Sequence, residues 1–230
     1  MMGPEVWENS NRLAKTRGRV VEVLSGLKSV SVVVALDCDG GEVLGLYRPE
    51  GGVHLSVDPR IPKPSELYRD AEYARMCRKV GWYFTAPVIP WRLNEGDMGV
   101  IRPYWRGVTK MEVYNFRRDI LLNNDSLFWM RVALADYIFG VGDRVSNDFL
   151  ITDNGLMVID SGFSYLPGLE FVGQQSIVRE VLGGENIPEQ LMNELRLFSE
   201  KSYRGEYLGD EEIYWVGQRI QRILGLKKII

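Results

Sequence analysis

The N-terminal part of the chain alternates between short apolar runs and turn residues. Three runs rich in β-branched side chains lie at 19–24, 29–36 and 42–47, and turns at 25–28 and 37–41 separate them. Runs of this composition favour β-strands, and short connections favour pairing between neighbours. The pattern therefore predicts three consecutive antiparallel strands.

A helical pattern follows these strands. Ser65 is a suitable N-cap for a helix over 66–80, whose apolar residues recur on one face, and Gly81 ends the pattern. Two further β-type runs lie at 82–90 and 98–101. We therefore expect a small β-rich unit that carries one helix.

The remaining chain is mostly helical in pattern. Apolar residues recur at helical spacing over five segments, near 110–122, 126–139, 174–182, 189–201 and 211–224. With 230 residues and 45% hydrophobic content, the chain can bury a sizeable core, either as one large domain or as two lobes that share a cleft.

One stretch departs from the helical pattern, because acidic residues stand at both ends of a predicted hairpin. Apolar runs at 149–151 and 156–159 flank Asp153-Asn154-Gly155, which is typical of a tight turn. The ends of such a hairpin lie side by side, so we expect Asp148 and Asp160 to be close neighbours.

Asp143 lies in the loop before this hairpin, so three carboxylates should share one small region. Carboxylates this close raise one another's pKa unless a cation lies between them, and oxygen ligands suit Mg²⁺. The alternative is that each residue is only a turn or cap residue, a common role for Asp and Asn. The occurrence of all three around one hairpin favours a divalent-metal site.

The loop and the hairpin together carry a motif. The sequence reads Asp143-Arg144-Val145-Ser146-Asn147-Asp148, then the apolar hairpin, then Ile159-Asp160-Ser161-Gly162. This arrangement resembles the phosphatidylinositol 3- and 4-kinase-like superfamily, including its small bacterial members, in which the loop reads D-R-H-x-x-N. Here Val145 replaces the histidine and Asp148 replaces the metal-binding asparagine, with Asn147 one position early.

The resemblance covers about residues 19–185 and implies an α+β, two-lobed protein-kinase-like fold. It also implies ATP and Mg²⁺ as cofactors and phosphoryl transfer to a hydroxyl group. The expected division is a terminal segment at 1–17, a small antiparallel β lobe for nucleotide binding at 18–101, a hinge at 102–105 and a helical catalytic lobe at 106–230.

The resemblance assigns roles to the acidic residues. Asp143 would orient and deprotonate the acceptor hydroxyl. Asp148 and Asp160, together with Asn147, would hold the metal between phosphate oxygens. Positioning and charge neutralisation carry most of phosphoryl transfer, so a few acids, one metal and one cation suffice.

Arg48 stands where the family has a phosphate-binding lysine followed by a proline. Asp70 lies on the inward face of the predicted helix, whereas Glu72 points away, so Asp70 is the expected catalytic-site partner of Arg48. Arginine is longer than lysine and aspartate is shorter than glutamate. The exchange would therefore keep the separation that a bidentate ion pair needs.

The resemblance also implies further nucleotide contacts in the small lobe. These are Ser25, Gly26 and Lys28 in the first turn, beside the ATP phosphates, and Ile101, Pro103 and Tyr104 around the hinge, beside adenine. The alternative for the first turn is a plain hairpin connection, in which a single glycine is common.

Composition narrows the choice of partners. The formal charge is −3 and there is no basic run, so the sequence does not indicate a nucleic-acid-binding surface. The longest apolar run is too short to span a bilayer. Two cysteines, Cys38 and Cys77, and the single His54 exclude a disulfide framework and a Cys/His zinc site. The N-terminal residues lack the apolar stretch of a signal peptide, so we expect a cytoplasmic protein.

The expected partners are a nucleotide and a hydroxyl-bearing acceptor of unknown type: a protein, a lipid or a small molecule. Two other functions stay open. The first is a pseudokinase, which is a binding module without turnover, and the exchanges at Arg48 and Val145 favour this function. The second is the transfer of AMP from ATP, which stays possible because a fold alone does not determine which group is transferred.

Overall fold

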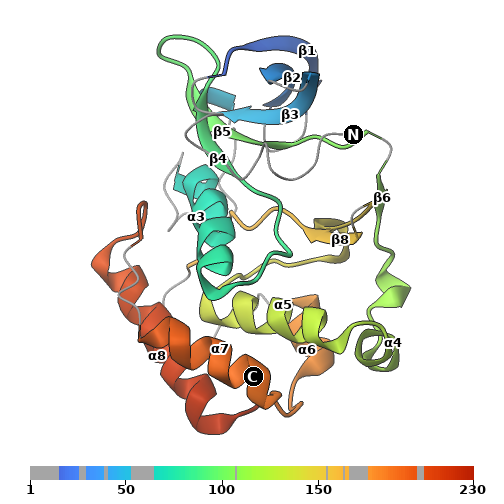
Figure 1. The fold of residues 1–230 in the computed structure, drawn as a ribbon, viewed down its shortest axis with the longest axis vertical. Coiled ribbons are helices and arrows are strands. Elements are labelled where there is room, and N and C mark those ends of the chain that lie inside the picture. The colour runs from blue at the N-terminus through green and yellow to red at the C-terminus, as the bar shows by residue number, and fades with distance from the viewer. Residues whose placement is uncertain are drawn as a thin grey trace.

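The computed structural model describes residues 16–25, 30–38, 41–52, 65–106, 108–153, 155–162, 164–165, 176–200 and 205–230. They form an α+β fold with two lobes, a sheet-rich one and a helical one (Figure 1). Gly26 and Lys28, two of the predicted phosphate contacts, lie outside the described residues.

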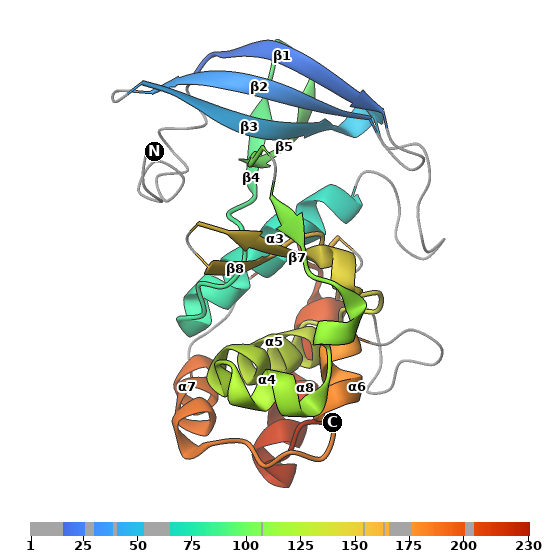
Figure 2. The ribbon, with the colours of Figure 1, turned by 90° about the vertical axis from the view of Figure 1, so that its right-hand side faces the viewer.

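The small lobe is built on a five-stranded antiparallel sheet. In spatial order its strands are β1 (Gly18–Ser25), β2 (Val30–Cys38), β3 (Gly41–Pro49), β5 (Met98–Pro103) and β4 (Ile89–Arg92). The three consecutive strands expected from the sequence are therefore confirmed. Figure 2 shows this sheet as the upper layer of the molecule.

Helix α3 (Ser65–Val80) crosses beneath the sheet, between it and the helical lobe (Figures 1 and 2). Leu67 and Ala71 on the helix pack against Val100 of β5, and all three are buried. A short 3-10 turn, η1 (Glu50–Gly52), follows β3. The apolar contact fixes one face of α3 against the sheet.

The large lobe contains five helices within the described residues: α4 (Arg118–Asn123), α5 (Ser126–Ile138), α6 (Ile177–Leu182), α7 (Glu189–Ser199) and α8 (Asp210–Leu226). Helix α5 is the centre of this lobe, since every residue from Trp129 to Ile138 except the half-buried Arg131 is buried. Its N-cap is Asp125, whose side chain accepts a hydrogen bond from the Phe128 amide at 3.1 Å. None of the helices in the described ranges is long and apolar enough to cross a membrane.

A three-stranded sheet lies between the two lobes. It consists of β6 (Thr109–Lys110), β7 (Phe149–Thr152) and β8 (Gly155–Val158), and the 3-10 turns η2 (Val113–Asn115) and η3 (Ser146–Asp148) precede α4 and β7. The prediction of a helix from residue 110 is wrong in its first part. The Met111 amide donates to the Phe149 carbonyl at 2.9 Å, so pairing with the hairpin replaces the expected first helical turns.

The predicted strand at 82–90 is also divided. Only Ile89 and Pro90 belong to β4, whereas Thr85 forms an isolated bridge to Val158 of β8. The Val158 amide donates to the Phe84 carbonyl at 2.9 Å and the Ala86 amide to the Val158 carbonyl at 3.1 Å. The segment before β4 therefore connects the small lobe to the hairpin that carries the acidic motif.

Candidate functional site

The β7–β8 hairpin has the register that the sequence predicts. Phe149 pairs with Val158, and the ladder continues by one bond, from the Ile159 amide to the Asp148 carbonyl at 2.9 Å. Asp148 and Asp160 therefore leave the same end of the hairpin. At the other end Gly155 has a φ of 103°, a left-handed conformation that favours glycine in a tight turn.

Asp148 turns inward while its neighbour Asn147 is exposed. The Asp148 side chain is 13% exposed, and one of its oxygens accepts a hydrogen bond from the Val145 amide at 2.9 Å. Burial raises the pKa of Asp148 to about 7, and the charges of Asp160 and Asp143 add to that rise. The three carboxylates therefore share one electrostatic environment, in which Asp148 is better placed than Asn147 to bind a metal.

Val145, at the position of the family histidine, serves this site through its backbone. Its side chain is exposed and its amide is the donor to Asp148. A histidine side chain at this position would have supplied a titratable group, which valine does not. Asp143, two residues earlier, is half-buried, so its carboxylate retains access to solvent.

Asp160 has a left-handed backbone with a φ of 58°. Non-glycine residues rarely adopt this region, and such residues concentrate at functional sites. About half of the side chain is exposed, and one carboxylate oxygen lies 3.7 Å from Nη1 of Arg48. The conformation turns the chain so that the carboxylate faces the small lobe while Ser161 faces helix α3.

Arg144, the second residue of the motif, is fully buried and organises the loop. It forms an ion pair with Asp136 of α5 at 3.1 Å and donates to the Ile159 carbonyl at 2.7 Å. It also donates to the Asp160 carbonyl at 3.3 Å and to the Ser161 hydroxyl at 2.9 Å. One guanidinium therefore holds both ends of the motif against the core of the large lobe.

Asp136 was not singled out by sequence reasoning, although it is the counter-ion that Arg144 needs. Its carboxylate also accepts from the Tyr73 hydroxyl at 2.8 Å and the Ser176 hydroxyl at 2.7 Å. A buried charge is tolerated when it is paired and hydrogen-bonded. The signal in the sequence was an acidic residue near the end of a mostly apolar helix.

Asp70 is buried, and its carboxylate accepts a hydrogen bond from the Ser161 amide at 2.9 Å. Burial raises the pKa of Asp70, while the positive charge of Arg102 is the strongest influence that lowers it. Arg102 belongs to β5, and its Nη1 atom is buried with no hydrogen-bond partner among the described residues. Arg102 is a site residue that the sequence analysis did not identify as one.

Arg48 does not form the predicted direct pair with Asp70. Its ion-pair partner is Asp160, and the described ranges contain no Arg48–Asp70 ion pair. The register explains the difference: Arg48 pairs with Val100 and Leu46 with Arg102, so both arginines lie on one face of the sheet. Arg102 contributes more than Arg48 to the stabilisation of the Asp70 charge, and Arg48 extends to Asp160.

Gly162, the glycine of the motif, passes close to the start of α3. A Cβ atom there would lie 2.8 Å from the carbonyl oxygen of Glu66. Any side chain would therefore push the motif away from the helix. The glycine allows the approach that lets the Ser161 amide reach Asp70.

The hinge region differs from the expectation in its backbone bonding. Strand β5 extends to Pro103, two residues further than predicted, and Ile101 lies between β3 and β4, so its backbone belongs to the sheet. Proline has no amide hydrogen, and the Tyr104 amide already donates to the Leu44 carbonyl at 3.0 Å. The amides of these three residues are therefore not open for adenine. Ser25 ends β1, at the turn that lies outside the described residues.

A divalent cation fits the acidic end of the hairpin. Within the described part of the chain, no three His, Cys, Asp or Glu side chains are grouped closely enough to enclose a metal by themselves. Mg²⁺, however, commonly binds through one or two carboxylates together with substrate phosphates. Asp148 and Asp160 supply that number, and a bound cation would stabilise the charged form of Asp148, whose pKa is raised first by burial and then by the charges of Asp160 and Asp143.

Comparison with known proteins shows which solved structures the whole fold resembles. No protein-family profile matches the sequence, and no curated protein matches it. Among solved structures, hydra Fam20 with sugar is similar over 93% of this chain and 86% of its own, with a TM-score of 0.58 and 11% identity. The Golgi casein kinase with Mn/ADP bound is similar over 97% and 76%, with a TM-score of 0.59 and 10% identity. The chain therefore has a kinase-like fold.

Proposed function

We propose that this protein is an ATP- and Mg²⁺-dependent phosphotransferase that moves a phosphoryl group to a hydroxyl acceptor. The observation that carries the proposal is the hairpin end, where Asp148 and Asp160 lie side by side and Arg48 lies 3.7 Å from Asp160. Two carboxylates and one cation at the junction of the lobes are the groups that positioning of MgATP requires. A neighbouring fold that was crystallised with Mn/ADP supports a nucleotide and a divalent metal.

Each residue has a distinct task in this proposal. Asp148 and Asp160 hold the metal, which neutralises phosphate charge when it is bound. Arg48 binds phosphate oxygens from the sheet, and Asp70 holds the Ser161 amide, which fixes the turn after Asp160. Asp143 orients the acceptor hydroxyl and accepts its proton, since it is half-buried beside the other two acids.

The motif makes the phosphatidylinositol 3- and 4-kinase-like superfamily the favoured affiliation within kinase-like folds. The D-R pair supports it, because Arg144 links the loop to both Ile159 and Ser161. The loss of the histidine at Val145 implies that Asp143 works without an imidazole from the loop. Slow turnover follows, because one positioned acid or base typically contributes ~10²- to 10⁴-fold to a rate.

Mass spectrometry after incubation with ATP tests the proposal. The protein is incubated with MgATP and with candidate acceptors, and the masses of protein and acceptors are measured before and after. A mass increase of one phosphate group supports phosphoryl transfer. A mass increase of one AMP group would show nucleotidyl transfer instead. If calorimetry shows MgATP binding but neither mass appears and no ADP accumulates, the protein is a pseudokinase. The variant Asp160→Asn serves as the negative control.

A further inference from the structure

The turn after Asp160 is held by two neighbouring residues of helix α3. Asp70 accepts a hydrogen bond from the Ser161 amide at 2.9 Å. Arg69, the preceding residue, donates through Nη1 to the Ser164 carbonyl. The backbone of Asp160 is left-handed, and such conformations persist where the surrounding structure over-determines them. The position of α3 therefore helps to set the turn that directs the Asp160 carboxylate.

Arg69 is in turn held by the first turn of helix α8. Its Nη2 atom forms an ion pair with Glu212, and the two side chains are 12% and 21% exposed. The other carboxylate oxygen of Glu212 accepts a hydrogen bond from the Gly209 amide at 2.7 Å, which caps α8. Because a guanidinium is a rigid planar fork, a shift of Glu212 also redirects the bond to Ser164. The start of α8, Arg69 and the turn after Asp160 therefore form one continuous chain of contacts.

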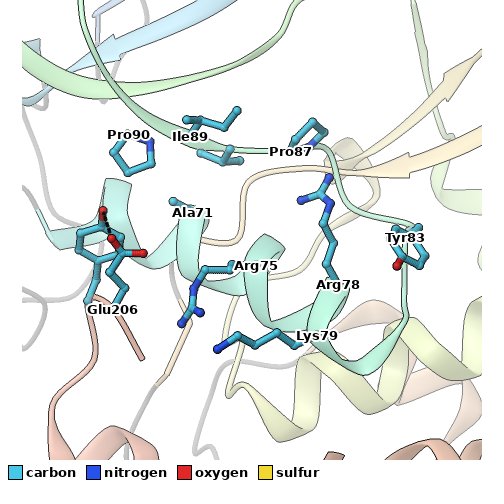
Figure 3. A pocket seen from close by; sticks show the side chains of 11 residues that line it. Ala71, Arg75, Arg78, Lys79, Tyr83, Pro87, Ile89, Pro90 and Glu206 are labelled. Atoms are coloured by element: carbon cyan, nitrogen blue, oxygen red, sulfur yellow. Dashed lines mark hydrogen bonds between the residues drawn. The ribbon is translucent and has the colours of Figure 1, made fainter. Parts of the chain in front are cut away.

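The chain just before α8 contacts α3 as well. The Glu206 amide donates to Glu72 at 3.3 Å, and Tyr207 stacks on Tyr68 with ring centroids 5.0 Å apart and planes inclined at 27°. Figure 3 shows Glu206 beside the helix, at one end of a cavity of about 670 Å³. A cavity supplies no packing contacts to the helix that borders it. The position of α3 on this side therefore depends on Glu206, Tyr207 and Glu212, which we call the α8 clamp.

The two supports of the turn differ in burial. From the large lobe, Arg144 donates to the Asp160 carbonyl at 3.3 Å, and both partners of its ion pair with Asp136 are fully buried. From α3, support passes through the Arg69–Glu212 pair, which keeps some contact with solvent, and the neighbouring clamp residues are exposed. Contacts of the second kind open at a lower free-energy cost than buried ones. The α8 clamp is therefore the adjustable support.

We infer that Glu212 is a positioning residue for the Asp160 carboxylate and that it acts through Arg69. With the clamp intact, α3 holds the turn after Asp160, and the carboxylate faces Arg48. Without the charge of Glu212, Arg69 loses the partner that orients its fork, and α3 holds the Ser161 amide less firmly. The link to MgATP rests on the proposed phosphotransferase function, whereas the contacts themselves need no ligand.

Amide hydrogen exchange of the protein in a chelating buffer tests this link without any nucleotide. The variant is Glu212→Gln, which keeps an acceptor for the α8 cap and removes the charge that pairs with Arg69. We expect the Ser161 amide to exchange about tenfold faster in the variant. The Ile159 amide, which is bonded within the hairpin ladder, should keep the parent rate. Equal Ser161 rates in the two proteins, or an equal rise at both amides, would overturn the inference.

Calorimetry extends the test to the metal. Glu212→Gln should weaken MgATP binding about three- to tenfold and leave the affinity for ATP in a chelating buffer unchanged, because contacts behind a metal ligand act through that ligand. Glu189→Gln is the matched control, since Glu189 is a first-turn glutamate of α7 that pairs with Arg196, and it should change neither affinity. Equal losses of MgATP and ATP affinity in Glu212→Gln would contradict a role toward the metal ligand.

A second pair of variants tests the route through Arg69. In an Arg69→Gln background, Glu212→Gln should cause no further loss of MgATP affinity, and a further loss would show that Glu212 acts by another route. Should Arg69→Gln not fold, Arg69→Lys replaces it, because lysine keeps the charge but lacks the fork that reaches both Ser164 and Glu212. Arg69→Lys should lose as much affinity as Glu212→Gln, and parent affinity would overturn the inference. If the parent chain binds no MgATP, the proposed function fails, and the exchange rates alone decide the link between Glu212 and Ser161.

Discussion

The two sides of helix α3 face opposite charges. On one side, the buried Asp70 accepts a hydrogen bond from the Ser161 amide, and the positive charges of Arg102 and Arg48 lower its pKa. On the other side, Arg75, Arg78 and Lys79 line a cavity together with Glu206, the one acid among its described lining residues. On the hairpin side, Arg102 and Arg48 stabilise the charge of Asp70, and on the cavity side Arg75 is hydrogen-bonded to Glu72. The described charged groups on the hairpin side are mainly the acids of the motif, and those that line the cavity are mainly basic.

The largest expected effect concerns Asp143. Replacing it by asparagine keeps its shape but removes the group that accepts the hydroxyl proton, so we expect turnover to fall by ~10² to 10⁴. The measurement is the rate of ADP formation or of phosphate incorporation at saturating MgATP. Asp153→Asn makes the same chemical change at an exposed position in the hairpin turn and should have no effect.

An unchanged rate in Asp143→Asn would contradict the catalytic role proposed for Asp143 on the hairpin side of α3. MgATP affinity measured on the same variant separates the alternatives. A slow variant with unchanged affinity supports a role for Asp143 toward the acceptor, whereas a slow variant with weak binding places the residue on the metal.

The next effect concerns Asp160, whose carboxylate faces Arg48. Asp160→Asn removes a metal ligand but keeps a side chain that tolerates the left-handed backbone at this position. We expect MgATP to bind ~10- to 100-fold more weakly, with a smaller loss for ATP measured in a chelating buffer. Calorimetry with and without Mg²⁺ measures both. Equal losses in the two buffers would show that Asp160 acts on Arg48 and not on a metal.

The sequence contained enough local information to predict the hairpin but not its surroundings. Residues 149–159 specify their own partner strand through apolar runs and a turn, so the proximity of Asp148 and Asp160 could be predicted. The pairing of Thr109 and Lys110 with this hairpin joins segments far apart in the chain, and a helical pattern there masked it. Long-range pairing overrides local propensity where a sheet edge is available.

The partners of the two arginines show the same limit. Wheel geometry placed Asp70 on the inward face of α3, which the burial of Asp70 confirms. Whether Arg48 or Arg102 lies closest to it depends on the register of β3 against β5, which the sequence does not display. Glu72 does point away from Asp70, yet it is buried, because the segment around Glu206 covers it.

A smaller effect should appear in the pH dependence of stability. The pKa of Asp148 is raised in the folded protein to about 7 from 3.8, so the folded state binds this proton more tightly than the unfolded state. Folding stability from this group is therefore greatest at low pH and falls as pH rises from about 4 to 7. Asp148→Asn removes the penalty, and we expect it to stabilise the protein by about 2 to 3 kcal/mol more at pH 8 than at pH 5.

Urea unfolding at both pH values in a chelating buffer measures this difference. Asp153→Asn again provides the control, since it is exposed at the far end of the same hairpin. Saturating Mg²⁺ sharpens the test, because a metal on Asp148 stabilises its charged form and should reduce the advantage of the variant. A stability difference that is independent of pH would contradict the raised pKa of Asp148.

The smallest effect is a coupling between Arg48 and Arg102. They are diagonal neighbours on one face of the sheet, both stabilise the charge of Asp70, and Arg102 has a buried Nη1 atom without a hydrogen-bond partner in the described ranges. If both also bind phosphate, removing one lets the other move toward the ligand or toward Asp70, so the losses should not add. In a double-mutant cycle of Arg48→Gln and Arg102→Gln on MgATP affinity, we expect a coupling of at least about 0.5 kcal/mol. Additive losses would mean that the two arginines act separately, and no loss in Arg102→Gln would restrict that residue to neutralising Asp70. In the second case, the positive charge that binds phosphate opposite the acidic hairpin would come from Arg48 alone.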